Sequence, residues 1–212
     1  MAKFQGNNVK VGTGTLYAAP VGTAEPVSVS GAWPAGWRTI GYTDTGSEFD
    51  STPTTADVLV EEEYFPVRIA TVSLKGSLTF SMAEVTLDNL ALSLNAGTGG
   101  NLVTSTFGTL QNATDAAIWQ EVPLPGQEVR VALGWDALVE GATAVAGSPT
   151  YLARLIARQC LQTGSVKRIA RKGNNKAMYA VTFSFEKPPV GTPAQNTTGS
   201  PFRWLGPPQD AS

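Results

Sequence analysis

The sequence predicts a mainly β protein with one flanking helix, and two long alternating segments carry that prediction. In the segment 68–82, apolar residues occupy every second position from Ala70 to Met82, interrupted only by Gly76, and small or polar residues fill the places between them. The same alternation recurs from 177 to 185. A period of two places one set of side chains on each face of a strand. We therefore expect these two segments to form the spine of one antiparallel sheet.

The composition is typical of a β protein with many turns, and it argues against several kinds of chemistry. The 212 residues include 22 glycines and 14 prolines, and only 15% are charged, compared with ~25% in an average globular domain. The chain has no histidine, the commonest general base and metal ligand. Its single cysteine, Cys160, can form neither an internal disulfide nor a zinc site alone. We expect no catalytic site, no metal and no cofactor.

Shorter alternating or extended segments predict the remaining strands. They span residues 9–17, 37–43, 56–65, 102–107, 118–122, 129–136 and 165–171. The segment 151–163 fits either a helix or a strand, and the strand-like residues beyond Gly164 favour a strand. Segments 165–171 and 177–185 are expected to pair as a hairpin around Gly173, Asn174 and Asn175, which tolerate turn conformations.

One helix and two irregular regions complete the prediction. Apolar residues recur at helical spacing over 85–96, with Asp88 near the start, Leu92 off the apolar stripe and Gly97 placed as the cap. Residues 44–55 read as an extended loop. Residues 1–187 are expected to form one β domain that includes a long loop, 43–65. Residues 188–212 form a flexible or draped tail rich in proline and glycine, in which Phe202, Trp204 and Leu205 make an apolar spot.

Charge is distributed in two blocks of opposite sign. Seven acids and no base lie between Arg38 and Arg68, and eight bases and one acid lie from 154 to 187. The two blocks could pair within one chain, or head to tail between copies. Nucleic-acid binding by the basic block is disfavoured by the net charge of −2. The Glu61–Glu63 run is a poor catalytic group, because neighbouring strand residues point to opposite faces.

The N-terminal residues and the apolar runs also limit where the protein acts. The first ten residues, MAKFQGNNVK, contain no apolar core of the kind found in secretion signals. No apolar run approaches the ~20 residues of a membrane helix. We therefore expect synthesis in a reducing cytoplasm and no membrane partner.

Four stretches, taken in order, carry a family resemblance. They are LYAAPVGT (16–23), WRTIGYTDTGSEF (37–49), LKGSLTFSMAEVTLDNLALSLNAG (74–97) and CLQTGSVKRIARKGNNKAMYAVTFSFEKP (160–188). In order and pattern the chain resembles the major tail tube proteins of long, non-contractile-tailed bacteriophages (siphoviruses). The resemblance spans most of residues 9–188.

The resemblance implies a fold, an assembly and a set of partners. It implies a β-sandwich or half-barrel with one flanking helix, and hexameric rings stacked into a tube around a tape-measure protein. The tube would conduct DNA during ejection, with transient non-specific DNA contacts in its lumen. Terminator and tip proteins would bind its ends. The protein would belong to the virion and assemble in the host cytoplasm.

Two sets of residues follow from this implied assembly. The long loop would reach the adjacent ring, so the expected inter-ring contacts are Asp44, Glu48, Asp50, Asp57, Glu61, Glu62, Glu63, Lys167, Arg168, Arg171 and Lys172. The polar face of the central strand would line the lumen through Thr71, Ser73, Lys75, Ser77, Thr79 and Ser81. On the opposite face, Val72, Leu74, Leu78 and Phe80 would face the core.

A second class of function stays open from the residues alone. A monomeric or dimeric β-sandwich that binds a ligand, or decorates a virion or cell surface, would show the same alternation and the same lack of a catalytic site. Electron microscopy of concentrated protein distinguishes the two classes, because only a tube subunit forms rings or tubes.

Overall fold

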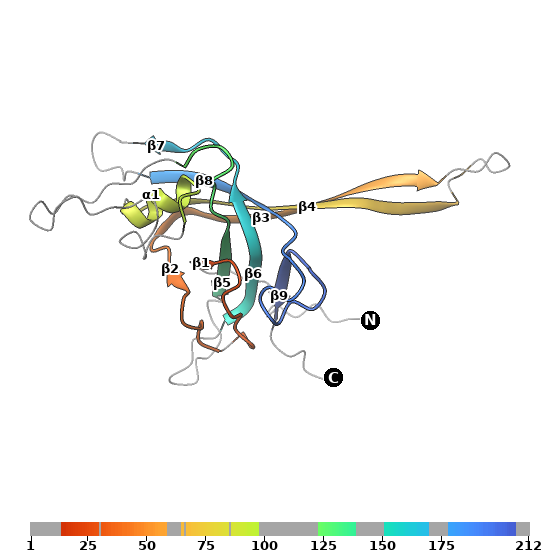
Figure 1. Cartoon of the computed structure of the whole chain (residues 1–212), viewed down its shortest axis with the longest axis horizontal. Coiled ribbons are helices and arrows are strands. Elements are labelled where there is room, and N and C mark those ends of the chain that lie inside the picture. The colour runs from red at the N-terminus through yellow and green to blue at the C-terminus, as the bar shows by residue number, and fades with distance from the viewer. Residues whose placement is uncertain are drawn as a thin grey trace, which may run out of the picture.

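The computed structural model describes residues 14–29, 31–58, 65, 67–84, 86–97, 123–138, 151–169 and 178–206 (Figure 1). The described elements are β1 (Gly14–Pro20), β2 (Arg38–Thr39), β3 (Thr43–Val58), β4 (Arg68–Met82), α1 (Leu87–Ser93), β5 (Val131–Leu138), β6 (Tyr151–Gln162), β7 (Lys167–Ile169), β8 (Met178–Phe185) and β9 (Phe202–Leu205). The mainly β prediction is confirmed.

The described strands form one antiparallel sheet. The strand order is β2-β1-β5-β6-β8-β4-β3, with β7 on β8 and β9 on β6. The end strands β2 and β3 follow each other closely in the chain, and residues of both line one cleft. The sheet therefore curls until its two ends approach each other, which gives it the form of a half-barrel.

The predicted pairing of the two long alternating segments is confirmed. β4 pairs with β8 from Ser77↔Ser184 to Met82↔Tyr179. The apolar side chains of both strands are buried in one hydrophobic core: Leu78, Phe80, Met82, Tyr179, Val181 and Phe183. Their burial on a single face is the reason for the alternation in the sequence.

The prediction that Val72 and Leu74 face the core is wrong. Their exposed fractions are 66% and 50%. The β4–β8 ladder stops at Ser77, and the earlier part of β4 runs on past the end of β8 (Figure 1). Only the second half of β4 therefore lies over the core.

The predicted loop at 44–55 is instead a strand. β3 pairs with β4 along its whole length, from Thr43↔Met82 to Val58↔Arg68. The threonine-rich sequence favours a strand, and Pro53 is tolerated because β3 is the edge of the sheet. Residues 56–58 of the predicted strand 56–65 form the end of β3. Residues 59–64 lie outside the described residues.

The helix is confirmed, but it is shorter than predicted. It begins after Thr86, whose hydroxyl accepts a hydrogen bond from the Asn89 amide at 3.2 Å. Asn95 takes the positive φ of 57° that ends the helix, two residues before Gly97. Leu92, predicted to lie off the apolar stripe, has an exposed fraction of only 1% and packs in the main core.

The remaining predictions have mixed outcomes. Residues 151–162 are a strand, and β7 pairs with β8 as the predicted hairpin requires. In the tail, where no strand was predicted, β9 pairs with β6. The predicted strands at 102–107 and 118–122 lie outside the described residues, as do most of the first predicted strand and the turn at 173–175.

The two halves of β4 are expected to respond differently to truncation. Leu78→Ala should lower the free energy of unfolding by about 2–5 kcal/mol, because it removes a buried side chain and leaves a cavity. Leu74→Ala should have a much smaller effect, because its side chain is half exposed. Urea unfolding of both variants measures the difference, and equal losses would show that the first half of β4 is also packed.

Candidate assembly surface

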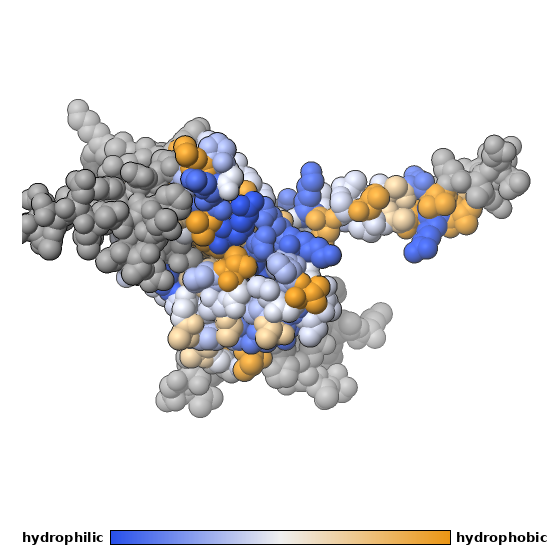
Figure 2. All heavy atoms as spheres, in the orientation of Figure 1, coloured by the Kyte–Doolittle hydropathy of each residue, from blue (hydrophilic) through white to orange (hydrophobic). Residues whose placement is uncertain are grey.

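The most exposed part of the described structure is a two-stranded ribbon, which we call the arm: residues 50–58 of β3, with residue 67 and residues 68–76 at the start of β4. Every residue from 50 to 58 is exposed, as is every residue from 67 to 75 except Ala70. The arm projects well beyond the body (Figure 1). Figure 2 shows apolar side chains spaced along it between polar ones.

The pairing of the two strands places apolar side chains of the arm on the face that continues the core. Leu74 lies opposite Pro53, four residues along β4 from the pair of Leu78 with Phe49. Thr54 pairs with Ser73, but Thr55 pairs with Thr71. Such a shift is a β-bulge with one extra residue on β4, Val72.

The bulge changes which β4 residues share a face. β3 keeps its period across the bulge, so Ile69, opposite Asp57, lies on the same face as Leu74. The sequence contains an indication of the bulge: the large apolar residues occupy even positions from Val72 onward, but Ile69 occupies an odd position. By the same shift Thr71 leaves the face that it was predicted to share with the other five polar residues of β4.

The arm has backbone edges that pair with no strand in the described part of the chain. The outer edge of β3 is one end of the strand order. The opposite edge of the ribbon, residues 68–76 of β4, lies beyond the last β4–β8 pair. Unpaired edges and exposed apolar faces are the features through which strands join other chains.

The predicted contact residues lie in several places. Glu48, Asp50 and Asp57 are exposed on β3, and Lys167 and Arg168 belong to β7. Glu61, Glu62, Glu63, Arg171 and Lys172 lie outside the described residues, as does the side chain of Asp44. Among the predicted lumen residues, Ser73, Lys75 and Thr79 are exposed and Ser77 and Ser81 are half-buried. Their roles in assembly stay predictions.

Two members of the basic block are buried and serve the fold. The Arg158 guanidinium binds the Glu25 carboxylate and donates to the Asn196 side chain at 2.9 Å. Arg154 binds Asp136, with Nε to Oδ1 at 2.6 Å and a second contact at 2.8 Å. Both acids lie outside the predicted acidic block, and among the described residues no ion pair joins the two blocks.

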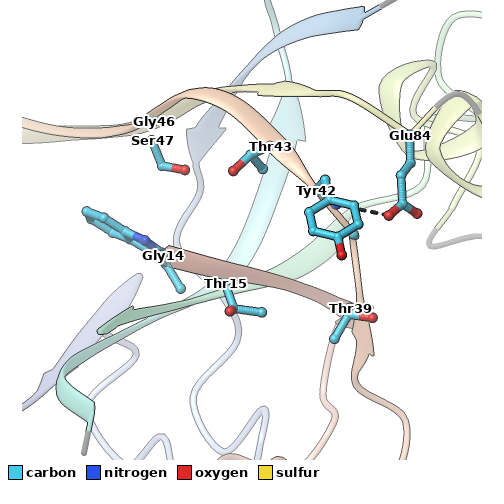
Figure 3. A pocket seen from close by; sticks show the side chains of 10 residues that line it. Gly14, Thr15, Thr39, Tyr42, Thr43, Gly46, Ser47 and Glu84 are labelled. Carbon is cyan, nitrogen blue, oxygen red and sulfur yellow. Dashed lines mark hydrogen bonds between the residues drawn. The ribbon is translucent and has the colours of Figure 1, made fainter. Parts of the chain in front are cut away.

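A cleft of about 700 Å³ lies between the two ends of the curled sheet (Figure 3). Its described lining comes from β1, β2, the segment 41–47, Glu84 and Trp135 of β5, and is rich in hydroxyl and glycine residues. The Glu84 carboxylate accepts a hydrogen bond from the Tyr42 amide at 3.1 Å. Gly14 is needed here because a Cβ would lie 2.2 Å from the Trp135 indole nitrogen.

Other chemical sites find no support in the described residues. Burial raises the pKa of the Cys160 thiol, so the sulfur stays protonated and is a poor nucleophile. No group of three possible metal ligands occurs among the residues that the structure describes. Within the same residues, no helix has the length and apolar character needed to cross a membrane.

These features define the class of the protein: a half-barrel of antiparallel strands whose most exposed element is a long two-stranded arm. The family model for phage tail tube proteins matches residues 1–121. The chain belongs to the phage tail tube protein family, and it is a structural component of the virion. The predicted family is thereby confirmed at the level of tail tube proteins.

Two further comparisons add little to this assignment. One chain in a cryo-EM structure titled as the anti-feeding prophage (AFP) baseplate, 6-fold symmetrised, aligns with 97% of this chain and 98% of its own length. The sequence identity is 8% and the TM-score 0.46, too distant to support a statement about this chain. No curated protein matches the sequence.

Proposed function

We propose that this protein is the tube subunit of a long, non-contractile phage tail. Hexameric rings of the subunit stack into a tube that surrounds the tape-measure protein and later conducts DNA. The observation that carries the proposal is the arm, a ribbon with exposed faces and unpaired edges in a chain of the tail tube family. The protein assembles in the host cytoplasm and catalyses no reaction.

The physical argument for assembly starts from the instability of a lone ribbon. A two-stranded hairpin is at best marginally stable in water, because it has no layer to pack against. Ile69, Val72 and Leu74 are exposed. Covering these apolar side chains with a neighbouring subunit lowers the free energy of the assembled state. Joining strands of successive subunits around a closed ring also removes the exposed edges.

Self-assembly of the purified protein tests the proposal. Concentrated wild-type protein is expected to form rings or tubes visible by negative-stain electron microscopy, with matching heavy species in analytical ultracentrifugation. Monomer or dimer alone at every concentration would contradict the proposal and favour a binding or decoration module instead.

A matched pair of substitutions tests the arm. Ile69 and Val190 have nearly the same exposed fraction, 64% and 65%, but only Ile69 lies on the arm. Ile69→Glu should strongly reduce tube formation, because burying an unpaired charge in an interface is costly. Val190→Glu should assemble like the wild type. Equal assembly of the two variants, followed by sedimentation, would show that the arm face is not a contact.

The two charge blocks supply the proposed polarity of stacking. We place the acidic residues of the segment 44–63 against Lys167, Arg168, Arg171 and Lys172 of the next ring. Each exposed pair contributes only ~0–1 kcal/mol, but repeated pairs around a ring set register and orientation. The lumen face is assigned to Ser73, Lys75, Ser77, Thr79 and Ser81, on the opposite side from the apolar arm face.

Charge reversal tests the stacking contact. Changing Glu61, Glu62 and Glu63 to Lys should block polymerisation in low salt and leave the fold intact. Reversing the four bases to Glu in the same chain should restore part of it, since the attraction is re-created with opposite signs. Polymerisation of the triple variant at the wild-type rate, measured by light scattering, would rule out the contact. Unfolding of that variant would indicate pairing within one subunit.

A further inference from the structure

Four aromatic side chains meet where the arm leaves the body, and we call them the aromatic clamp: Phe49, Phe185, Phe202 and Trp204. The Phe49 ring centre lies 5.4 Å from those of both Phe202 and Trp204, and 5.9 Å from that of Phe185. These separations are within the ~4.5–7 Å range of favourable aromatic pairs. Three strands distant in the sequence, β3, β8 and β9, therefore meet at the base of the arm.

The Phe185 ring of the clamp packs directly against the backbone of β4 at the point where the arm begins. A Cβ on Gly76 would lie 2.7 Å from Cδ2 of Phe185, so only glycine lets this ring pack so closely. Gly76 is also the first β4 residue beyond the last pair with β8, at Ser77. The glycine that interrupts the alternation of β4 therefore marks the base of the arm.

We propose that the aromatic clamp sets the direction in which the arm points. Beyond Gly76 the described arm has no strand pairing except that between its own two strands. Its direction then depends on what packs at its base, and the apolar face of the base is packed by the clamp. Phe49 and Gly76 are positioning residues in this sense.

The length of the arm turns a small error at its base into a large error at its end. From Gly76 to Arg68 the ribbon extends about 26 Å, at ~3.3 Å per residue. A tilt of about 10° at the base moves the far end by ~5 Å, which is one spacing between neighbouring strands. A loosened clamp would therefore present the arm to a neighbouring subunit out of register. This consequence rests on the proposed function of the arm.

Distance measurements between spin labels test the clamp without relying on assembly. Labels are placed on the exposed positions of Asp57→Cys, on the arm, and Ala180→Cys, on the body. The buried Cys160 is not expected to react. The distance distribution should be narrow in the otherwise wild-type chain and at least about twofold broader with Phe49→Ala or Trp204→Ala, because the aromatic contacts are lost. Gly76→Ala should shift the mean distance by displacing Phe185.

Two control variants distinguish the loss of the clamp's aromatic contacts from a non-specific effect of substitution on the fold. Trp204→Phe keeps an aromatic ring and should restore a narrow distribution. Thr182→Val removes the 3.1 Å hydroxyl contact with Thr79 on the other face of the sheet and should leave the distribution unchanged. Trp204 is 43% exposed, so Trp204→Ala should stay folded even if Phe49→Ala does not. An unchanged width in folded Trp204→Ala, or equal broadening in Thr182→Val, would overturn the clamp.

The same variants distinguish failure of the clamp from failure of the proposed function. In a sedimentation assay, Trp204→Ala should form fewer tubes than Trp204→Phe. Broadened distances with unimpaired tube formation would support the clamp and overturn the role of the arm in assembly. If the distances are unchanged in Trp204→Ala, the proposed role of the clamp is overturned. If the Ile69→Glu variant also fails to assemble, the proposed function is still supported.

Discussion

Replacing Asp136 by alanine is expected to lower the free energy of unfolding by about 3–5 kcal/mol, because it leaves a buried guanidinium without its counterion. Asp136 and Arg154 have exposed fractions of 0% and 1%. Arg154 also donates to the carbonyls of Ser28 and Gly31, at 3.0 and 2.8 Å. The Trp33 indole nitrogen donates to Asp136 at 2.8 Å, and the Trp33 ring stacks under the guanidinium. One carboxylate therefore holds together a loop and two strands.

A partly exposed ion pair provides the control for this loss. Glu186 lies 3.2 Å from Arg130, and both side chains are more than a third exposed. Glu186→Gln should change stability by less than about 1 kcal/mol, because water screens the pair. Urea unfolding of both variants gives the comparison. A similar small change in both would mean that the Arg154 guanidinium finds water or another partner once the carboxylate is removed.

Excising the arm is expected to abolish tube formation while leaving the body folded. Ser51 and Gly76 lie opposite each other in the β3–β4 ladder. Replacing residues 52–75 by Asn-Gly would join them through a two-residue hairpin turn. Among the removed residues that the structure describes, all except Ala70 are exposed, so the core should lose little apolar contact. Circular dichroism and thermal unfolding follow the body, and electron microscopy follows the tubes.

Either part of this expectation can fail. Tubes of normal appearance from the shortened chain would show that assembly uses other surfaces, such as the outer edges of the body. A shortened chain that does not fold would show that the arm also stabilises the body, in contrast to its exposure. The two outcomes are separated because folding and assembly are measured independently.

The sequence by itself determined two long strands of the sheet and their pairing. Alternation in β4 and β8 is a local property of the chain, since successive side chains point to opposite faces of a strand. The pairing of these two strands was predicted correctly, and so was the helix over part of 85–96. The bulge on the arm is also visible in the sequence, because the apolar positions shift from odd to even numbers between Ile69 and Val72.

Only the tertiary structure decided where the core ends and which charges are buried. Leu74 and Leu78 occupy equivalent positions in the alternation, yet Leu78 is buried and Leu74 is half exposed, because β8 ends beside Ser77. Arg154 and Arg158 are buried because each has an acid partner from another part of the chain: Asp136, 18 residues away, and Glu25, 133 residues away. The β9 strand exists through its pairing with β6. Burial is set by partners that the fold brings together, and no local pattern contains that information.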